Sequence, residues 1–290
     1  MINLLDIRYV RLGTRDIVGA TRYAEKILGL RECTRHGHSK NGQQVYFRSD
    51  DRDHTLVYFD GDPGDHTTAF EVTDEAALDA AAAQLERLGR AVHRGTPAQA
   101  DERRVRAFIN FRDPTGNAID LVVGPYHSGV RFSPTRDVGT TGFSHVGLRT
   151  TDPVRDEKFW TEVLNAKVSD RIGKAPLLRI DEVHHKIALF PSAHAGVQHI
   201  NHQVQSIDDI MRSWYFLQKE GVRVVFGPGR HPTSGAMFLY FEGPDGMVYE
   251  YSSGVRSITD PDHQPRQFPF HPTGFCMWGS RPDIPEFKDA

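Results

Sequence analysis

The chain has 290 residues and a formal net charge of −3, with 25 % charged and 38 % hydrophobic residues, which is typical of a globular protein large enough for two domains. This balance excludes the basic footprint of a nucleic-acid-binding protein, and the two cysteines are too few for a disulfide framework. No apolar run approaches the ~18 residues of a membrane span and the first residues lack the apolar core of a secretory signal, so we predict a cytoplasmic protein with no membrane or nucleic-acid partner.

The first half of the chain predicts two successive units of strand, helix and further strands. Residues 9–30 indicate a short strand, a turn at Asp16 and an amphipathic helix, and residues 53–59 indicate another strand. Residues 69–89 repeat the order of strand, helix cap and helix. Residues 108–124 then predict a hairpin that turns at a Pro-x-Gly segment.

The second half repeats these elements in the same order, after a segment rich in Gly, Ser and Thr. Four stretches match: 9–30 with 145–166, 53–59 with 184–190, 69–89 with 201–221, and 108–124 with 238–254. The offset falls only from 136 residues (9 to 145) to 130 residues (108 to 238). This regularity indicates a duplication with small loop deletions.

We therefore predict an α+β fold of two tandem domains, each made of two βαβββ modules. Residues 1–125 form the first domain and residues 126–142 form a linker, because Gly, Ser and Thr cluster there. Residues 143–254 form the second domain. Residues 255–290, which contain Pro, Phe and Trp without periodicity, are predicted to cross a surface as an irregular tail.

Polar residues that differ between matched positions of the two halves are informative, because the scaffold is shared. Three such differences fall at corresponding strand positions: Tyr9 against His145, Thr67 against His199, and Asp120 against Glu250. Two imidazoles and one carboxylate form the 2-His-1-carboxylate ligand set of non-haem Fe(II) oxygenases. The second half is therefore predicted to bind a divalent metal, and the first half is not.

The strand that carries Glu250 supports this interpretation. With the alternation of a β-strand, Val248 and Glu250 share one face, and Met247, Tyr249 and Tyr251 share the other. If the Val248 face is buried, the Glu250 carboxylate is buried with it and needs a partner. A bound metal ion would compensate its charge.

With these residues in view, the chain resembles a type I extradiol dioxygenase of the vicinal oxygen chelate superfamily, similar to catechol 2,3-dioxygenase and 2,3-dihydroxybiphenyl 1,2-dioxygenase. The resemblance spans nearly the whole chain and is carried by four motifs: "FSHVGLRTTD" (143–152), "HHKIAL" (184–189), "VQHINHQV" (197–204) and "RHPTSGAMFLYFEGPDGMVYEY" (230–251). One residue departs from the pattern, since His202 stands where relatives commonly have an aromatic or apolar residue.

The resemblance implies a function and a site. It implies Fe(II), with Mn(II) as the alternative ion, held by His145, His199 and Glu250. It implies His185 as the acid–base residue, His231 as a residue beside the metal ligands and Tyr240 as a substrate contact. The implied reaction inserts both atoms of O2 into a catechol-type, substituted aromatic diol and opens the ring next to the diol, in aromatic catabolism. Relatives are usually assemblies, so a homo-oligomer is expected.

Other readings of individual residues stay open. His185 is matched by His54 in the half without a metal site, so it could be an ordinary strand histidine. His231 could be an exposed loop residue, and Tyr240 an ordinary strand tyrosine. His184 is expected to point to the opposite face from His185 and to be structural. The remaining polar candidates are interpreted as solvated or packing residues: His194, His202 and the basic run at 102–106.

Two alternative functions also stay open. A glyoxalase-like metal enzyme of the same superfamily would use the metal as a Lewis acid and would consume no oxygen. A metal-free binding module of the bleomycin-resistance type would sequester a ligand between the modules. Fold alone does not distinguish these functions. The substrate pocket is expected to be lined by the second domain, with Phe268, Phe270 and Trp278 as candidates from the tail.

Overall fold

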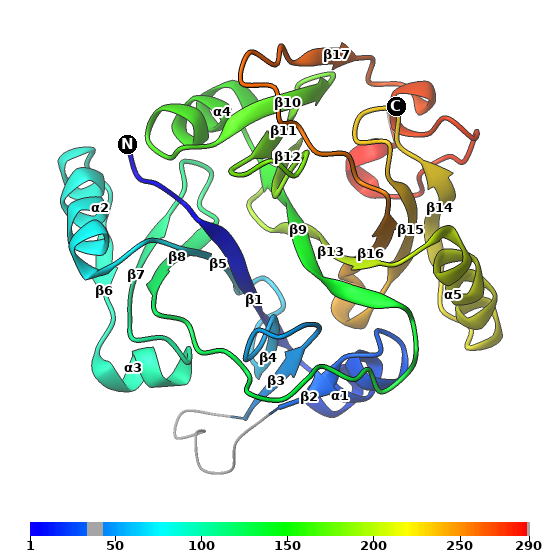
Figure 1. Ribbon diagram of the computed structural model, residues 1–290, viewed down its shortest axis with the longest axis horizontal. Coiled ribbons are helices and arrows are strands. Elements are labelled where there is room, and N and C mark those ends of the chain that lie inside the picture. Colours follow the sequence, from blue (N-terminus) through cyan, green and yellow to red (C-terminus); the bar gives the residue numbers. More distant parts are fainter. Residues whose placement is uncertain (34–42, 289–290) are drawn as a thin grey trace.

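Four βαβββ modules follow one another in the computed structural model, which describes residues 1–33 and 43–288 (Figure 1). The first half contains β1 (Asp6–Thr14), α1 (Ile17–Lys26), β2 (Arg31–Glu32), β3 (Gln44–Arg48), β4 (Leu56–Asp60), β5 (His66–Glu71), α2 (Glu75–Arg87), β6 (Val92–Arg94), α3 (Pro97–Glu102), β7 (Ala107–Arg112) and β8 (Ala118–Val123). The second half contains β9 (Thr140–Thr150), α4 (Pro153–Glu162), β10 (Lys167–Ile172), β11 (Ala175–Arg179), β12 (Ile187–Pro191), β13 (Val197–Val204), α5 (Ile207–Lys219), β14 (Val224–Arg230), β15 (Met237–Glu242), η1 (Pro244–Gly246) and β16 (Val248–Ser253). The predicted α+β class with two modules in each half is confirmed.

The two halves form separate sheets with the same strand order. The first sheet runs β2-β3-β4-β1-β5-β8-β7-β6, and the second runs β10-β11-β12-β9-β13-β16-β15-β14. Each strand of one sheet therefore has a counterpart in the other. The second sheet has one more strand, β17 (Arg266–Phe268), which pairs with β10 at its edge.

Helix caps form where the sequence predicts the turns at aspartate. The Asp16 carboxylate accepts a hydrogen bond from the Gly19 backbone N–H (2.8 Å), and the Asp152 carboxylate accepts one from the Arg155 backbone N–H (3.1 Å). Such caps satisfy backbone donors that the first helical turn leaves free. Among the helices of the described residues, none is long and apolar enough to cross a membrane.

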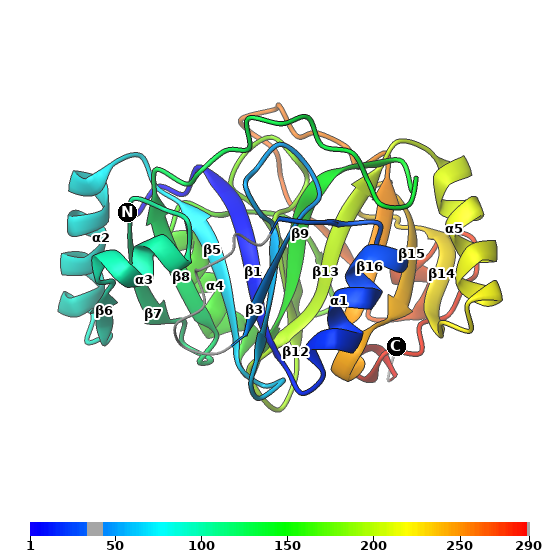
Figure 2. The same cartoon turned by 90° about the horizontal axis from the view of Figure 1, so that it is seen from below.

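The two halves share one hydrophobic core, because the helix of each leading module reaches the other half. Trp160 of α4 packs edge-on against Phe70 of β5, with ring centroids 5.5 Å apart. In the opposite direction, the Tyr23 hydroxyl of α1 donates to the Glu242 carbonyl (2.8 Å). Figure 2 shows β1 and β9 in the middle of the molecule, with α2 and α5 at its two ends. The second half, which carries the candidate site, is thus packed against the first half through both α1 and α4.

Three predicted segments differ from the structure. Strand β12 starts at Ile187, so His184 and His185 precede it instead of alternating within it. Strand β9 starts at Thr140, inside the range predicted as linker. The tail is not wholly irregular, because it contains β17, α6 (Pro272–Phe275) and η2 (Pro285–Phe287). These elements form by pairing or packing with distant segments, which leave no local pattern in the sequence. The domain boundaries themselves stay a prediction.

Candidate metal centre and active site

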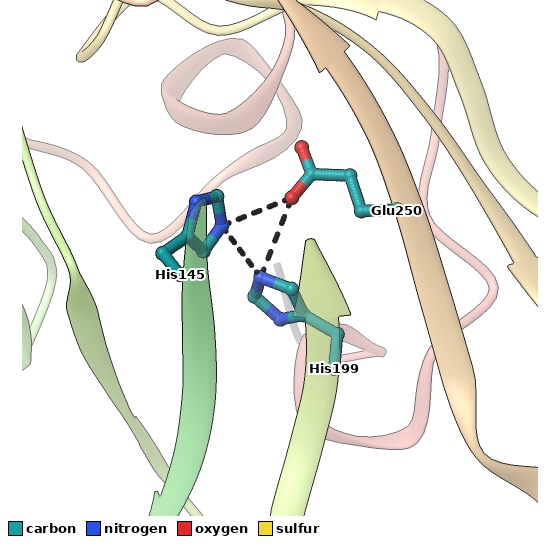
Figure 3. Close-up of side chains that lie close together, drawn as sticks. All are labelled: His145, His199 and Glu250. Carbon is teal, nitrogen blue, oxygen red and sulfur yellow. Dashed lines mark hydrogen bonds and ion pairs between the residues drawn. The ribbon is translucent and has the colours of Figure 1, made fainter. Parts of the chain in front are cut away.

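Three neighbouring strands of the second sheet bring His145, His199 and Glu250 together. His145 lies on β9, His199 on β13 and Glu250 on β16, and these strands are adjacent in the order β16-β13-β9. The register places Asn201 directly between His145 and Glu250. Residues opposite each other in a sheet, and residues two apart in one strand, share a face. The side chains therefore project to a common point, as Figure 3 shows.

The predicted alternation along β16 is also observed. Tyr249 belongs to the main core, whereas Val248 belongs to a second apolar cluster on the other face of the sheet. Glu250 shares that second face and is 1 % exposed. Its carboxylate is buried, as the sequence indicates, and the two imidazoles lie beside it.

The three side chains converge closely. The Nε2 atoms of His145 and His199 are 3.0 Å apart. The Glu250 Oε2 atom lies 3.0 Å from His145 Nε2 and 3.4 Å from His199 Nε2. All three residues are buried, and one donor atom from each lies within 4.8 Å of the others. A single ion could contact all three.

The electrostatics of this cluster suit a cation. Burial lowers the pKa of His199 to about 3, against the attraction of Glu250, so the imidazole is neutral at pH 7 and has a lone pair to offer. Burial acts to raise the pKa of Glu250, but its interactions with His145, His231 and His199 hold that pKa well below its usual range. The Oε2 atom has no well-formed hydrogen bond among the described residues. Two imidazoles and a buried carboxylate oxygen without a hydrogen-bond donor fit a divalent metal.

Three further polar residues surround this cluster. His185, His231 and Tyr240 line a cavity together with His199. The His185 and His145 ring centroids are 4.3 Å apart. The Tyr240 hydroxyl lies 3.2 Å from His231 Nε2, and His231 Nε2 lies 3.6 Å from Glu250 Oε1. The structure thus places four of the six predicted residues, His185, His199, His231 and Tyr240, around one cavity, and the other two, His145 and Glu250, directly beside them. Their roles stay predictions.

Comparisons with known proteins identify the family. The model of the glyoxalase/bleomycin resistance protein/dioxygenase superfamily matches residues 6–121 and again residues 142–251. The chain belongs to this superfamily. It is 27 % identical to the iron-dependent extradiol dioxygenase of Rhodococcus jostii (strain RHA1), over 96 % of this chain and 97 % of that protein.

Two solved structures show how closely the superfamily fold is kept. A halotolerant catechol dioxygenase superposes with a TM-score of 0.87 at 24 % identity, covering 100 % of this chain and 98 % of the other. The Mn(II)-bound glyoxalase of Novosphingobium aromaticivorans superposes with a TM-score of 0.85 at 24 % identity, covering 99 % and 94 %. At this identity the likeness concerns the fold, which an oxygenase and a glyoxalase share.

In this member of the superfamily, the first half holds an arginine where the second half offers a metal site. The buried Asp120, which corresponds to Glu250, accepts hydrogen bonds from the Tyr9 hydroxyl (2.9 Å), the Arg103 Nε (2.7 Å) and the Asn110 amide (2.7 Å). The guanidinium of Arg103 compensates the carboxylate charge there. The basic run at 102–106 was predicted to be solvated or to pack. Arg103 packs against Asp120, whereas Arg106 is exposed to solvent.

Replacing Arg103 with methionine is expected to lower the free energy of unfolding by about 3–5 kcal/mol, because Asp120 is left as a buried charge without its cation. The kcat of the folded enzyme should not change. Chemical denaturation and steady-state kinetics measure the two effects. Arg106→Met is the matched control, since Arg106 belongs to the same run but is 61 % exposed and pairs with an equally exposed Glu75; its cost should stay below about 0.5 kcal/mol.

The candidate metal site includes a close approach at a glycine that sequence reasoning missed. A Cβ atom on Gly147 would lie 2.4 Å from His199 Nδ1 and 2.7 Å from His199 Cε1. Gly147 pairs with His199 across β9 and β13, so the imidazole lies over the bare backbone. The duplication contained a signal for this glycine. Gly147 is matched by Arg11, and Arg11 pairs with Thr67, the counterpart of His199, so the loss of a side chain coincides with the gain of the imidazole.

We expect Gly147→Ala to displace the His199 imidazole and to weaken metal binding by about 10- to 100-fold, the range seen when residues that orient metal ligands are changed. Equilibrium titration with Fe(II) under anaerobic conditions measures the effect. Gly129→Ala serves as the control, because a Cβ there would have open space. Unchanged metal affinity in Gly147→Ala would show that the contact of the His199 imidazole with the Gly147 backbone does not position His199 for metal binding.

The tail contributes two aromatic residues to the cavity, but not those predicted. Phe275 and Phe287 line it, whereas Phe268 and Phe270 only pack against the apolar cluster around it and Trp278 is 51 % exposed. The periodicity of the tail is too weak to predict which of its aromatic rings turn inward.

Of three further histidines, His184 differs from its predicted orientation and His202 and His194 agree with their predicted readings. His184 does not point away from His185, because their Nδ1 atoms lie 3.0 Å apart. The expectation assumed strand alternation, and β12 begins only after both residues. His202 is buried beside Phe143, with ring centroids 6.0 Å apart, which agrees with the packing reading. His194 is exposed, which agrees with its prediction as a solvated residue.

Proposed function

We propose that the protein is an Fe(II)-dependent extradiol dioxygenase. It inserts both atoms of O2 into a catechol-type aromatic diol and cleaves the ring next to the diol. The observation that carries this proposal is that His185, His231 and Tyr240 line the same cavity as His199, one of the three converging donors. The similarity to an iron-dependent extradiol dioxygenase along nearly the whole chain supports it.

His145, His199 and Glu250 would hold the metal. A redox-active divalent metal held there would supply a common binding point for the diol and for O2. We favour Fe(II) over Mn(II) because the similar protein of Rhodococcus jostii is iron-dependent. The first half, residues 1–125, is proposed to be a non-metal domain, since Arg103 already neutralises Asp120.

His185 is proposed as the acid–base residue. Burial and the neighbouring charges of His145 and His184 hold its pKa well below the ordinary value, so the ring is neutral at pH 7 and can accept a proton from a substrate hydroxyl. The same ring can return the proton later in the reaction. His185 lines the cavity and its ring lies next to that of the proposed ligand His145, which places it within reach of a substrate hydroxyl in that cavity.

Tyr240 and His231 are proposed to contact the oxygen atoms of bound substrate. Burial and the charge of Glu250 raise the pKa of Tyr240 well above its usual value, so its hydroxyl stays protonated and remains a donor. His231 Nδ1 hydrogen-bonds to the Phe275 carbonyl (2.8 Å) and therefore carries a proton. Its Nε2 atom lies 3.2 Å from the Tyr240 hydroxyl, so the two polar groups face the same part of the cavity.

The substrate is proposed to be a catechol with an apolar substituent. Apart from three histidines, Thr233 and Tyr240, the side chains that line the cavity are apolar: Ile172, Leu177, Ala188, Phe190, Phe275 and Phe287. Such a lining favours an alkyl or aryl group over a carboxylate, whose burial without a partner is costly.

Oxygen uptake tests this function. The Fe(II)-loaded protein should consume O2 with alkyl- and aryl-substituted catechols and form products that absorb visible light, and should turn over carboxylate-bearing catechols more slowly. Isomerisation of a thiol–aldehyde adduct without oxygen uptake would instead indicate glyoxalase-like chemistry. Retention of an aromatic ligand by a protein that binds no metal would indicate a binding module.

A further inference from the structure

A buried chain of hydrogen bonds leads from the tail to His185. His184 Nε2 lies 2.9 Å from Asp170 Oδ2, and His184 Nδ1 lies 3.0 Å from His185 Nδ1. Asp170 and His184 are both 0 % exposed. The chain ends at the cavity, because His185 lines it.

Asp170 acts as a hydrogen-bond acceptor only. Its Oδ1 atom accepts from the Arg266 backbone N–H (3.0 Å) and Nε (3.1 Å), and its Oδ2 atom accepts from Arg266 Nη2 (2.7 Å) and Arg256 Nη2 (3.1 Å). Burial acts to raise the pKa of Asp170, but the hydrogen bonds from His184 and Arg266 outweigh it and hold the pKa below its usual range. The carboxylate is therefore ionised and carries no proton to donate.

This acceptor determines where the protons of both histidines lie. Because the carboxylate accepts, His184 Nε2 must carry a proton. Burial lowers the pKa of His184 despite its bond to Asp170, so the neutral ring keeps a lone pair on Nδ1. That lone pair can only accept from the Nδ1–H of His185. The tautomer of His185 with its proton on Nδ1 has its lone pair on Nε2.

The tail fixes both members of this chain. Strand β17 pairs with β10 so that Arg266 stands opposite Asp170. The His184 backbone N–H donates to the Arg256 carbonyl (3.1 Å), and Val183 forms a bridge with Ser257. Residues from 255 onward thus hold the turn before β12 in place.

We propose that Asp170 and His184 are positioning residues that keep His185 in the tautomer with an unprotonated Nε2, the atom that takes the proton of a substrate hydroxyl. This inference rests on the proposed function of His185. The proton moves from the hydroxyl oxygen to Nε2, and the Nδ1–H bond to His184 persists. The Asp170 charge, acting through His184, stabilises the imidazolium that forms, as a buried aspartate does for a catalytic histidine.

Asp170→Asn tests the arrangement. The asparagine oxygen can replace only one of the two carboxylate oxygens. When it takes the Oδ1 position and keeps the Arg266 backbone N–H and Nε contacts, its NH2 group takes the Oδ2 position, meets His184 Nε2 and shifts both histidines to the other tautomer. In the Fe(II)-loaded enzyme we expect kcat with a substituted catechol to fall by about 10²-fold or more. Metal content should be unchanged and KM should stay within about twofold, since ground-state binding is not altered.

Two variants of His184 distinguish the loss of the hydrogen bond to His185 from a general folding defect. His184→Asn keeps an acceptor near His185 Nδ1, and its kcat should fall by no more than about tenfold, the scale of one hydrogen bond. His184→Leu has no acceptor and should lose as much kcat as Asp170→Asn. Asp53→Asn is the matched control, because Asp53 is a buried carboxylate paired with Arg104 (2.5 Å) in the first half; its kcat should be unchanged.

A double-variant comparison separates positioning from general structural support. In a His185→Ala background, Asp170→Asn should cause no further loss of kcat, because the residue that it positions is gone. If the two losses instead multiply, or if Asp170→Asn alone retains normal kcat, the inference is wrong although His185 keeps its proposed role. Normal turnover of His185→Ala by itself would overturn the proposed acid–base function and the inference with it.

Discussion

Glu250→Gln is expected to yield a folded protein that binds no stoichiometric divalent metal and cleaves no catechol. The neutral amide oxygen replaces the only charged donor of the cluster, and the two remaining imidazoles hold a divalent ion poorly in a buried site. Alanine at His145, His199 or Glu250 should have the same result. Metal content after anaerobic loading with Fe(II) and oxygen uptake with substituted catechols measure the loss.

Thermal unfolding adds a readout that does not depend on activity. Wild-type protein should gain about 2.7 kcal/mol of stability at a metal concentration one hundred times its Kd, and Glu250→Gln should gain nothing. The control is Asp120→Asn, the same change at the corresponding buried carboxylate of the first half, which should keep its metal. Full iron stoichiometry in all three alanine variants would remove the proposed ligand set.

His185→Ala is expected to keep its iron and to lose about 10²- to 10⁴-fold in kcat, the usual contribution of a positioned acid–base group. Metal binding survives because His185 is a neighbour of the cluster and not one of its three converging donors. The KM should change little, since the loss concerns proton transfer and not substrate binding. Single-turnover measurements with a substituted catechol separate the rate of the chemical step from substrate binding.

The first half offers the matched control for this variant. His54 occupies the corresponding place, is 5 % exposed and stacks on Tyr9 with ring centroids 4.9 Å apart. His54→Ala should cost stability, because it leaves a cavity beside Tyr9, but the kcat of the folded enzyme should not change. An equal loss of kcat in both variants would mean that a packing defect, and not lost proton transfer, explains the effect.

The sequence alone determined the fold class and the three donors that meet at the cluster. Hydrophobic periodicity and turn residues are local signals, and the duplication supplied each of them twice, so the βαβββ modules could be recognised before any contact was known. The same duplication exposed His145, His199 and Glu250 as polar differences at matched strand positions. Strand alternation then placed Glu250 on a buried face.

Only the tertiary structure decided what surrounds those donors. Three features of the surroundings involve residues from different elements. They are the close approach of His199 to Gly147, the ion pair of Arg103 with Asp120 and the hydrogen bond of His184 with Asp170. The tail rings that line the cavity were also decided there, because Phe275 and Phe287 turn inward through packing against the second half. Such contacts depend on the approach of one strand or segment to another in space, and no local periodicity encodes that distance.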